Sequence, residues 1–235
     1  MRKTLAVGEM AARDLLRRRG VLALLALMPL AFYLARRDTT GLAIRFVSLG
    51  LAWAVSTAAL FSGNAAKDVE RRLRLAGYRA SHLYLGRFCA VLAIGFVLAL
   101  GYFVVIVLDQ DVHRPAAIAL QMALTVAIAG PLGMLISAVA PRDLEGTLLL
   151  ITLVGLQLIV DPAKSSGKLL PLWSSRELTT YAVDLTGSDY LLRGLVHGLC
   201  FAVGLAATTA ALTVIRLRRR RHVMQMRPTY GQRDR

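Results

Sequence analysis

The sequence predicts an all-α membrane protein that crosses the bilayer several times, and three observations support this. The 235-residue chain is 56% hydrophobic, with a mean hydropathy of +0.56. Its apolar residues gather in long runs, as membrane-spanning helices require. Its Lys and Arg residues lie almost entirely between these runs and at the two ends of the chain. We therefore expect a polytopic helical bundle with an N-terminal interfacial helix, a cytoplasmic helix and short re-entrant helices on the outer side.

The N-terminal residues 1–19 have the pattern of an amphipathic helix. On a helical projection Leu5, Ala12 and Leu15 share one face, while charged residues such as Arg13 occupy the rest. A basic helix with one apolar face lies in the membrane interface. We therefore predict an interfacial helix on the inner side of the membrane.

Six apolar runs without any Asp or Glu follow, and residues 20–216 are assigned to one six-helix transmembrane domain that begins with a break at Gly20. A span needs about 20 apolar residues, and the first and fifth runs, of 15 and 14 residues, are shorter. Ion-driven transporters normally carry acidic or His side chains at mid-membrane, so these runs argue against coupling to a proton or sodium gradient. The runs are Val21–Ala35, Gly41–Gly63, Phe88–Leu108, Pro115–Ala140, Thr147–Val160 and Leu195–Ile215.

Proline and glycine residues modify three of these spans. Pro29 in the first span and Gly130 and Pro131 in the fourth predict kinks, which membrane helices tolerate. Gly194 and Gly198 form a GxxxG pattern at the start of the sixth span, and this pattern predicts close helix packing.

The loop Asn64–Arg87 is too regular to be a simple linker, and residues 64–80 are predicted to form a separate amphipathic helix. Glu70 and Arg74 stand at i,i+4, as do Asp68 and Arg72, so both pairs can form ion pairs. Gly77 is expected to end the helix. Five apolar residues recur at helical spacing: Ala66, Val69, Leu73, Ala76 and Ala80.

The distribution of basic residues sets the expected orientation. With both termini in the cytoplasm, 21 Lys and Arg residues lie inside and 7 outside, as the positive-inside rule requires. Because topology explains the net charge of +15, we expect no nucleic-acid partner. We expect residues 161–193 to form a hydrophobic outer element and residues 217–235 to form a basic cytoplasmic tail.

Sequence motifs for catalysis or metal binding are absent. In the nearest approach to a Walker A motif, Gly167–Lys168, the first glycine position holds Pro162 and the position after the lysine holds Leu169. The four His residues form no HExxH pattern. Cys89 and Cys200 fall within spans and are interpreted as small buried apolar residues. The chain is therefore not expected to be an enzyme or to hold a metal or a cofactor.

The Asn64–Arg87 segment resembles the coupling helix of ABC-2-type transporter permeases, the membrane subunits of ABC exporters. In that family a charged helix is followed by a Gly, a small residue–leucine stretch and a basic residue that opens the third span. Here these parts are Val69–Arg72, Gly77, Ser81–Leu85 and Gly86–Arg87. The layout of an interfacial helix, six spans and an outer hydrophobic element is also similar to that family.

The resemblance implies that a separate cytoplasmic ABC ATPase, which would hold the ATP and Mg²⁺, docks on the coupling helix. A second copy of the permease or a paralogue would complete the unit, which would lie in lipid of the bacterial cytoplasmic membrane. ATP-driven closure would then switch a cavity between inward-facing and outward-facing states. The docking residues would be Asp68, Glu70, Arg71, Arg74 and Gly77.

In that family the second and fifth spans line the pathway, which here would be largely apolar and would suit a hydrophobic or amphipathic drug, natural product or lipid. An alternative is that the Ser and Thr residues only bond within their helices or to neighbouring helices. The candidate pathway residues are Arg45, Ser48, Trp53, Ser56, Thr57, Thr152 and Gln157.

Two other functions stay open from the sequence. The chain could be a non-transporting anchor subunit of a regulatory complex. It could also be a self-sufficient transporter that uses Arg45 and His197, the notable ionisable residues within the spans.

Overall fold

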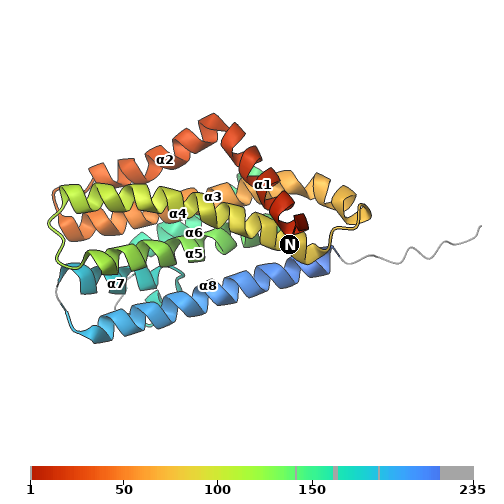
Figure 1. Ribbon diagram of the computed structural model, residues 1–235. Helices are drawn as coiled ribbons and strands as arrows, with labels where there is room; N and C mark the ends of the chain where they lie inside the picture. Colours follow the sequence, from red (N-terminus) through yellow and green to blue (C-terminus); the bar gives the residue numbers. More distant parts are fainter. Residues whose placement is uncertain (1, 141, 161–163, 185, 218–235) are drawn as a thin grey trace, which may run out of the picture.

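The structure is a computed structural model that describes residues 2–140, 142–160, 164–184 and 186–217. Over this part of the chain it is all-helical, which confirms the predicted class (Figure 1). The elements are α1 (Arg2–Arg17), α2 (Arg19–Leu34), α3 (Thr40–Leu75), α4 (Ala80–Asp109), α5 (Pro115–Val139), α6 (Asp143–Ile159), the 3₁₀ helix η1 (Gly167–Leu169), α7 (Trp173–Val183) and α8 (Ser188–Arg216).

Four helices are long and apolar enough to cross a membrane: α4, α5, α8 and the part of α3 over Thr40–Lys67. They correspond to the second, third, fourth and sixth predicted spans. The first and fifth runs form α2 and α6, of 16 and 17 residues, which is shorter than the roughly 20 residues of an ordinary span. Four spans are therefore supported by length and composition, and a total of six stays a prediction.

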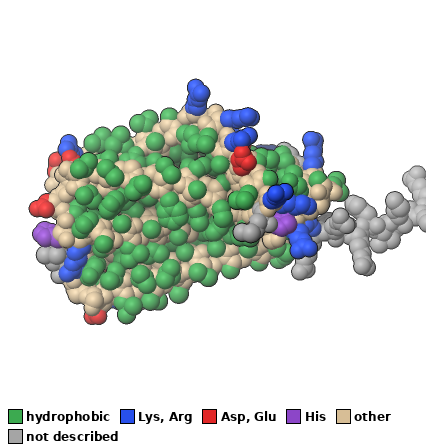
Figure 2. Space-filling view, viewed as in Figure 1, with side chains coloured by type: hydrophobic (Ala, Val, Ile, Leu, Met, Phe, Trp, Pro, Cys, Tyr) green, Lys and Arg blue, Asp and Glu red, His purple; other side chains and the backbone are tan. Residues whose placement is uncertain are grey.

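The helices form an elongated bundle with two distinct ends (Figure 1). One end carries α1, the α3–α4 connection and the last turn of α8, and we call it the α1 end. The other end carries α7 and the α4–α5 connection, and we call it the α7 end. Hydrophobic side chains cover the long face seen in Figure 2, and charged side chains gather mainly at the ends and at the α1–α2 corner. An apolar belt between polar ends is the distribution that a bilayer imposes.

The first helix packs across the beginning of α4. Its buried face consists of Val7, Ala11 and Leu15, whereas Leu5 from the predicted apolar face is exposed. The break before α2 falls at Arg18, outside both helices, and the prediction of a break at Gly20 was wrong.

The predicted separate helix over residues 64–80 is instead the continuation of the preceding span. α3 runs without interruption from Thr40 to Leu75, and α4 already begins at Ala80 rather than at Phe88. Gly77 ends α3 as predicted: its φ is +84°, and the amides of Gly77 and Tyr78 donate to the carbonyls of Arg74 and Leu73. This pattern is a Schellman motif, which needs a residue that tolerates positive φ.

The core of the bundle forms around α5, which packs against α3, α4, α6, α7 and α8. The closest approach is to α3, because Gly133 lies against the backbone of Ser56. A Cβ atom at Gly133 would stand 2.0 Å from the Ser56 carbonyl oxygen. The α5 helix runs unbroken through Gly130 and Pro131, and α2 likewise continues through Pro29.

The segment between α6 and α8 contains the two short helices η1 and α7. As predicted for GxxxG, Gly194 and Gly198 allow a close approach, and their partner is α7. Cβ atoms at these glycines would lie 3.2 Å from the Ser174 carbonyl oxygen and the Ser174 Cβ, respectively. α7 is consequently buried against α3, α5 and α8.

Both cysteines lie on the outside of the bundle. Cys89 and Cys200 are exposed, so the prediction that they are buried was wrong. In a chain that crosses a bilayer, such positions contact lipid, where a small apolar thiol is as well tolerated as in a core.

Substituting Gly133 by Ala should separate α3 from α5, because the obstacle is backbone and cannot rotate away. We expect a loss of about 1–3 kcal/mol, the usual range for overpacking, measured by unfolding in SDS. Gly204 of α8 is the matched control, since a Cβ there would meet nothing within 4 Å. Gly204→Ala should be neutral or stabilise by up to about 1 kcal/mol. Equal effects of the two substitutions would contradict the proposed close contact.

Candidate functional site

A network of buried hydrogen bonds links three helices at the α7 end. Gln121 of α5 is fully buried, and its Nε2 donates to the hydroxyls of Ser48 on α3, at 2.7 Å, and of Ser175 on α7, at 2.9 Å. Its Oε1 is buried without a hydrogen-bond partner. This amide fixes the beginning of α7 against the core.

Arg45 of α3 makes a second link to α7. Its Nη2 donates to Oγ1 of Thr180 at 2.9 Å, while its Nε is buried without a hydrogen-bond partner. The side chain is only partly exposed. Arg45 therefore holds its charge at the interface between α3 and α7 rather than free in solution.

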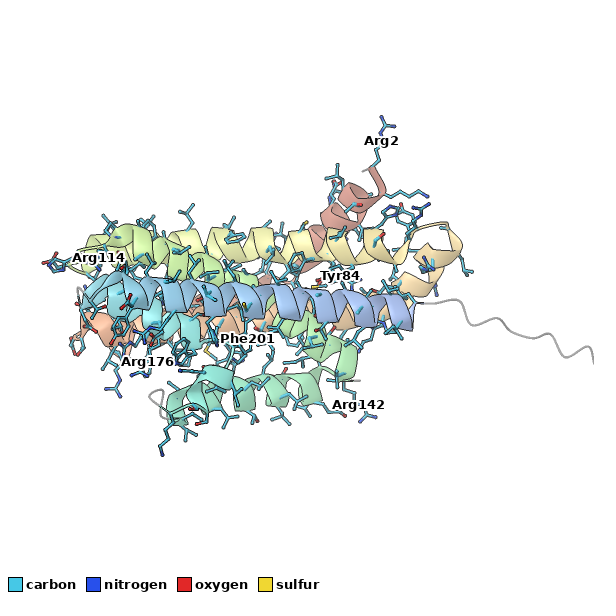
Figure 3. The ribbon with its side chains drawn as sticks, turned by 90° about the horizontal axis from the view of Figure 1, so that it is seen from below. Arg2, Tyr84, Arg114, Arg142, Arg176 and Phe201 are labelled. Carbon is cyan, nitrogen blue, oxygen red and sulfur yellow. The ribbon has the colours of Figure 1, made fainter. Side chains whose placement is uncertain are left out.

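A cavity of about 220 Å³ opens beside Arg45, bounded by α3, the end of α6, η1 and the beginning of α7. Its polar lining comes from Arg45, Gln157, Ser175 and Arg176, and Figure 3 labels Arg176 at the α7 end. The rest of the wall is mostly apolar, with Phe46 and Trp173 as aromatic members. A concave, mainly apolar site with a few polar groups is the usual form of a small-molecule site.

Of the predicted pathway residues, Arg45 and Gln157 line this cavity and the other five do not. Ser56 donates to the carbonyl of Ala129 inside the α3–α5 contact, and Ser48 donates to Ile44 and accepts from Gln121. These hydrogen bonds are of the kind expected if the serines only bond within their helices or to neighbouring helices.

The remaining three predicted residues also lie away from this cavity. Trp53 packs edge-on against Phe32 of α2, with ring centroids 6.2 Å apart. Thr152 is exposed on α6 and bonds to the carbonyl of Leu148. The hydroxyl of Thr57 is buried without a hydrogen-bond partner. Position in the second or fifth predicted span therefore did not by itself identify the cavity lining.

The α7 helix also brings a carboxylate into the bundle, which the acid-free spans did not predict. Glu177 is 7% exposed, and its Oε2 has no hydrogen-bond partner and lies 4.0 Å from Nε of Arg193. His197 stacks on Phe201 and contacts Trp173, and its Nε2 is 2.8 Å from the Lys168 carbonyl oxygen.

A larger hollow of about 570 Å³ lies between α2 and α4, beside α3. Its wall is almost entirely aliphatic. Tyr102 is the exception, and its hydroxyl donates to the carbonyl of Ala26. Among its described lining residues, the Tyr102 hydroxyl is the one polar side-chain group, and it is already bonded within the bundle.

At the α1 end, a buried carboxylate joins three helices. Glu70 of α3 is 2% exposed, and Arg87 of α4, 6% exposed, donates to its Oε1 at 2.7 Å. Arg216 of α8 donates to its Oε2. The predicted Glu70–Arg74 pair does not form, because Glu70 faces the bundle and Arg74 donates to the carbonyl of Tyr78.

The turn from α3 to α4 is the exposed tip of this end. Arg72, Leu75, Ala76, Gly77 and Arg79 are exposed there, and Leu75 is 82% exposed.

The structure places the predicted docking residues in different surroundings, some at the exposed tip and some inside the bundle. Gly77 lies at the tip and Arg74 is partly buried beside it. Glu70 is buried within the bundle and offers no surface to a partner in this conformation. Asp68 and Arg71 have side chains outside the described part of the structure, as does the predicted tail from residue 218 onward.

At the α7 end, the C-terminal ends of α2 and α4 are joined by a second cluster of polar side chains around one carboxylate. Asp109 accepts hydrogen bonds from Tyr33 and from Nε of Arg37, the latter at 2.9 Å. This contact raises the pKa of Arg37 above its usual value, because the carboxylate favours the charged guanidinium. The α2–α3 corner is thereby fixed to the end of α4.

Sequence patterns could have indicated several of these residues. Gln121 is a strongly polar amide in the fourth apolar run, and a polar residue inside a span is a functional or packing signal. Arg87 was predicted only as the basic residue that opens the third span, and Glu177 lies outside the apolar runs, so the burial of these two side chains was not predicted. The pairing of Arg216, which is partly exposed, was not predicted either. Their partners are distant in sequence, and one sequence alone cannot reveal such pairings.

Comparisons with known proteins find no protein-family model that matches this chain and no match among curated proteins. Assignment to the ABC-2-type permeases stays a prediction from residues 64–87 and from the layout of the spans.

Substituting Glu70 by Gln should destabilise the bundle, because two arginines would lose their only carboxylate partner within the described residues. Breaking a buried ion pair costs about 3–5 kcal/mol, measured by unfolding in SDS. The control is Glu9→Gln, which breaks the exposed Glu9–Arg13 pair of α1 and should change stability by less than about 1 kcal/mol. A small, equal effect of both substitutions would show that Glu70 does not hold the helices together.

Proposed function

We propose that this chain is the membrane permease subunit of an ABC exporter, driven by a separate ATPase subunit. It would act as a dimer with a second copy or a paralogue in the bacterial cytoplasmic membrane. The α1 end would face the cytoplasm and the α7 end the outside, as the distribution of basic residues predicts. The cargo would be hydrophobic or amphipathic.

The exposed tip of the α3–α4 turn is the observation that carries this proposal. It places an apolar side chain, Leu75, among the basic residues Arg72 and Arg79 at the end predicted to be cytoplasmic. A buried apolar anchor with a charged rim is the usual arrangement of a binding interface. The absence of a Walker A motif from the sequence fits a chain that takes its energy from a partner.

The Glu70 cluster suggests how movement at the tip would reach the spans. α3 is continuous from the tip to the α7 end, and Glu70 joins it to α4 and α8. A force applied at Leu75 would therefore act on three helices together rather than on a flexible loop. Arg45, which lines the cavity, lies on the same helix as the tip, near the other end of that helix.

A second candidate function draws on the buried carboxylate of Glu177. A buried carboxylate inside a membrane bundle, here with Arg193 beside it, is the kind of group that proton-coupled transporters use. This would make the chain a self-sufficient transporter. The discriminating test is transport by the chain alone in proteoliposomes with an imposed pH gradient, which the exporter proposal predicts to be absent.

The docking proposal is tested with Leu75→Asp, which places a charge at the proposed anchor. Loss of an interface hot spot costs about 2 kcal/mol or more, so binding to an ABC ATPase encoded beside this protein should weaken by roughly thirtyfold. Leu169→Asp is the control, since Leu169 is 78% exposed but lies in η1.

The binding measurement would use both purified subunits in detergent, with the affinity followed by co-purification and titration. Undiminished binding of the Leu75→Asp protein would contradict docking at this tip. Failure of any neighbouring ATPase to bind the unmodified chain would contradict the exporter proposal as a whole.

A further inference from the structure

The cavity beside Arg45 carries positive charge although most of its wall is apolar. Its charged lining residues among those the structure describes are two arginines, Arg45 on α3 and Arg176 on α7. Neither forms an ion pair with a described carboxylate. Both side chains line the same cavity, and the charge of Arg176 acts against that of Arg45 there.

Two carboxylates act on Arg45 without forming an ion pair with it. Asp184 and Glu177 attract Arg45, but neither comes within ion-pair distance of it. Glu177 is closer to Arg193, at 4.0 Å. The Nε of Arg45 is buried without a hydrogen-bond partner, and an unpaired buried donor on a charged group is costly. An anion in the cavity would satisfy this donor and reduce the repulsion between the guanidinium groups.

The remaining wall limits what the anion can be. Leu42, Phe46, Leu49 and Leu172 give the cavity a largely apolar surface, which a small inorganic ion would not use. Sites for drug-sized ligands occupy about 300–1,000 Å³, whereas this cavity of about 220 Å³ has room for a headgroup and the first part of a chain. Gln157 and Ser175 supply further hydrogen-bonding groups beside the arginines.

We propose that this cavity binds the oxyanion headgroup of an amphipathic molecule, with Arg45 and Arg176 as its ligands. A guanidinium group binds phosphate and carboxylate oxygens through paired hydrogen bonds. The apolar wall contacts the beginning of the hydrocarbon chain. That this amphiphile is the transported cargo rests on the proposed exporter function, whereas its binding does not.

Trp173 gives a direct readout of the cavity because it belongs to the wall. The chain has two tryptophans, so Trp53→Phe leaves Trp173 as the only one. The purified protein in dodecyl maltoside is titrated with dodecyl phosphate while the emission of Trp173 is followed. A saturable change is expected with dodecyl phosphate and none with dodecyltrimethylammonium or inorganic phosphate.

Two substitutions identify the binding groups in that background. Arg45→Gln and Arg176→Gln should each weaken dodecyl phosphate binding by about tenfold or more, because each removes a charged hydrogen-bond donor. Arg176 has no hydrogen bond in the described structure, so its loss should leave folding intact even if Arg45→Gln does not. Lys164→Gln is the control: it removes an exposed positive charge from the same end, outside the cavity.

Several results would overturn the proposal. Equal affinity for the anionic and cationic amphiphiles, or unchanged affinity in Arg176→Gln, would exclude recognition by the arginines. Inorganic phosphate binding as tightly as dodecyl phosphate would show a site for a free oxyanion instead. The titration contains no ATPase, so its outcome is independent of the exporter proposal. If the chain binds dodecyl phosphate but no ATPase docks on it, only the exporter function is overturned. If an ATPase docks but dodecyl phosphate does not bind, only this binding site is overturned.

Discussion

A carboxylate cannot stay charged inside a protein without compensating groups, and Glu70 has two of them, from Arg87 and Arg216. This cluster sets the geometry of the α1 end, because α3, α4 and α8 must all converge on one side chain. The tip beyond Glu70 is then a rigid extension of a span rather than a mobile loop. The proposed docking of an ATPase depends on that rigidity.

At the other end of the bundle, further polar groups fix α7 against α3 and α5. Gln121 and Arg45 bond to α7 side chains, and Gly194 gives the helix space to approach α8. The outer segment is consequently part of the bundle and forms one wall of the cavity. α3 connects the two ends, which makes it the element through which a signal from the tip would reach the cavity.

The sequence predicted the helical class and the position of each apolar run, because hydrophobic runs and helix-ending signals are local, but it wrongly separated residues 64–80 from the preceding span. The positive φ of Gly77 and the contacts of Gly194 agree with the patterns that predicted them. Side-chain partners were predicted poorly, because they depend on packing between distant helices. Glu70 pairs with Arg87 and Arg216 rather than with Arg74 one turn away, since burial favours contacts inside the bundle over an exposed i,i+4 pair. The acid-free spans likewise gave no sign that α7 would carry Glu177 inward.

Hydrogen–deuterium exchange of the Glu70→Gln protein in detergent tests the central claim most directly, because it reports the opening of each helix separately. If Glu70 joins the three helices, the end of α3, the beginning of α4 and the last turns of α8 should all lose protection together, while α5 stays protected. Loss of protection confined to the end of α3 would contradict this account.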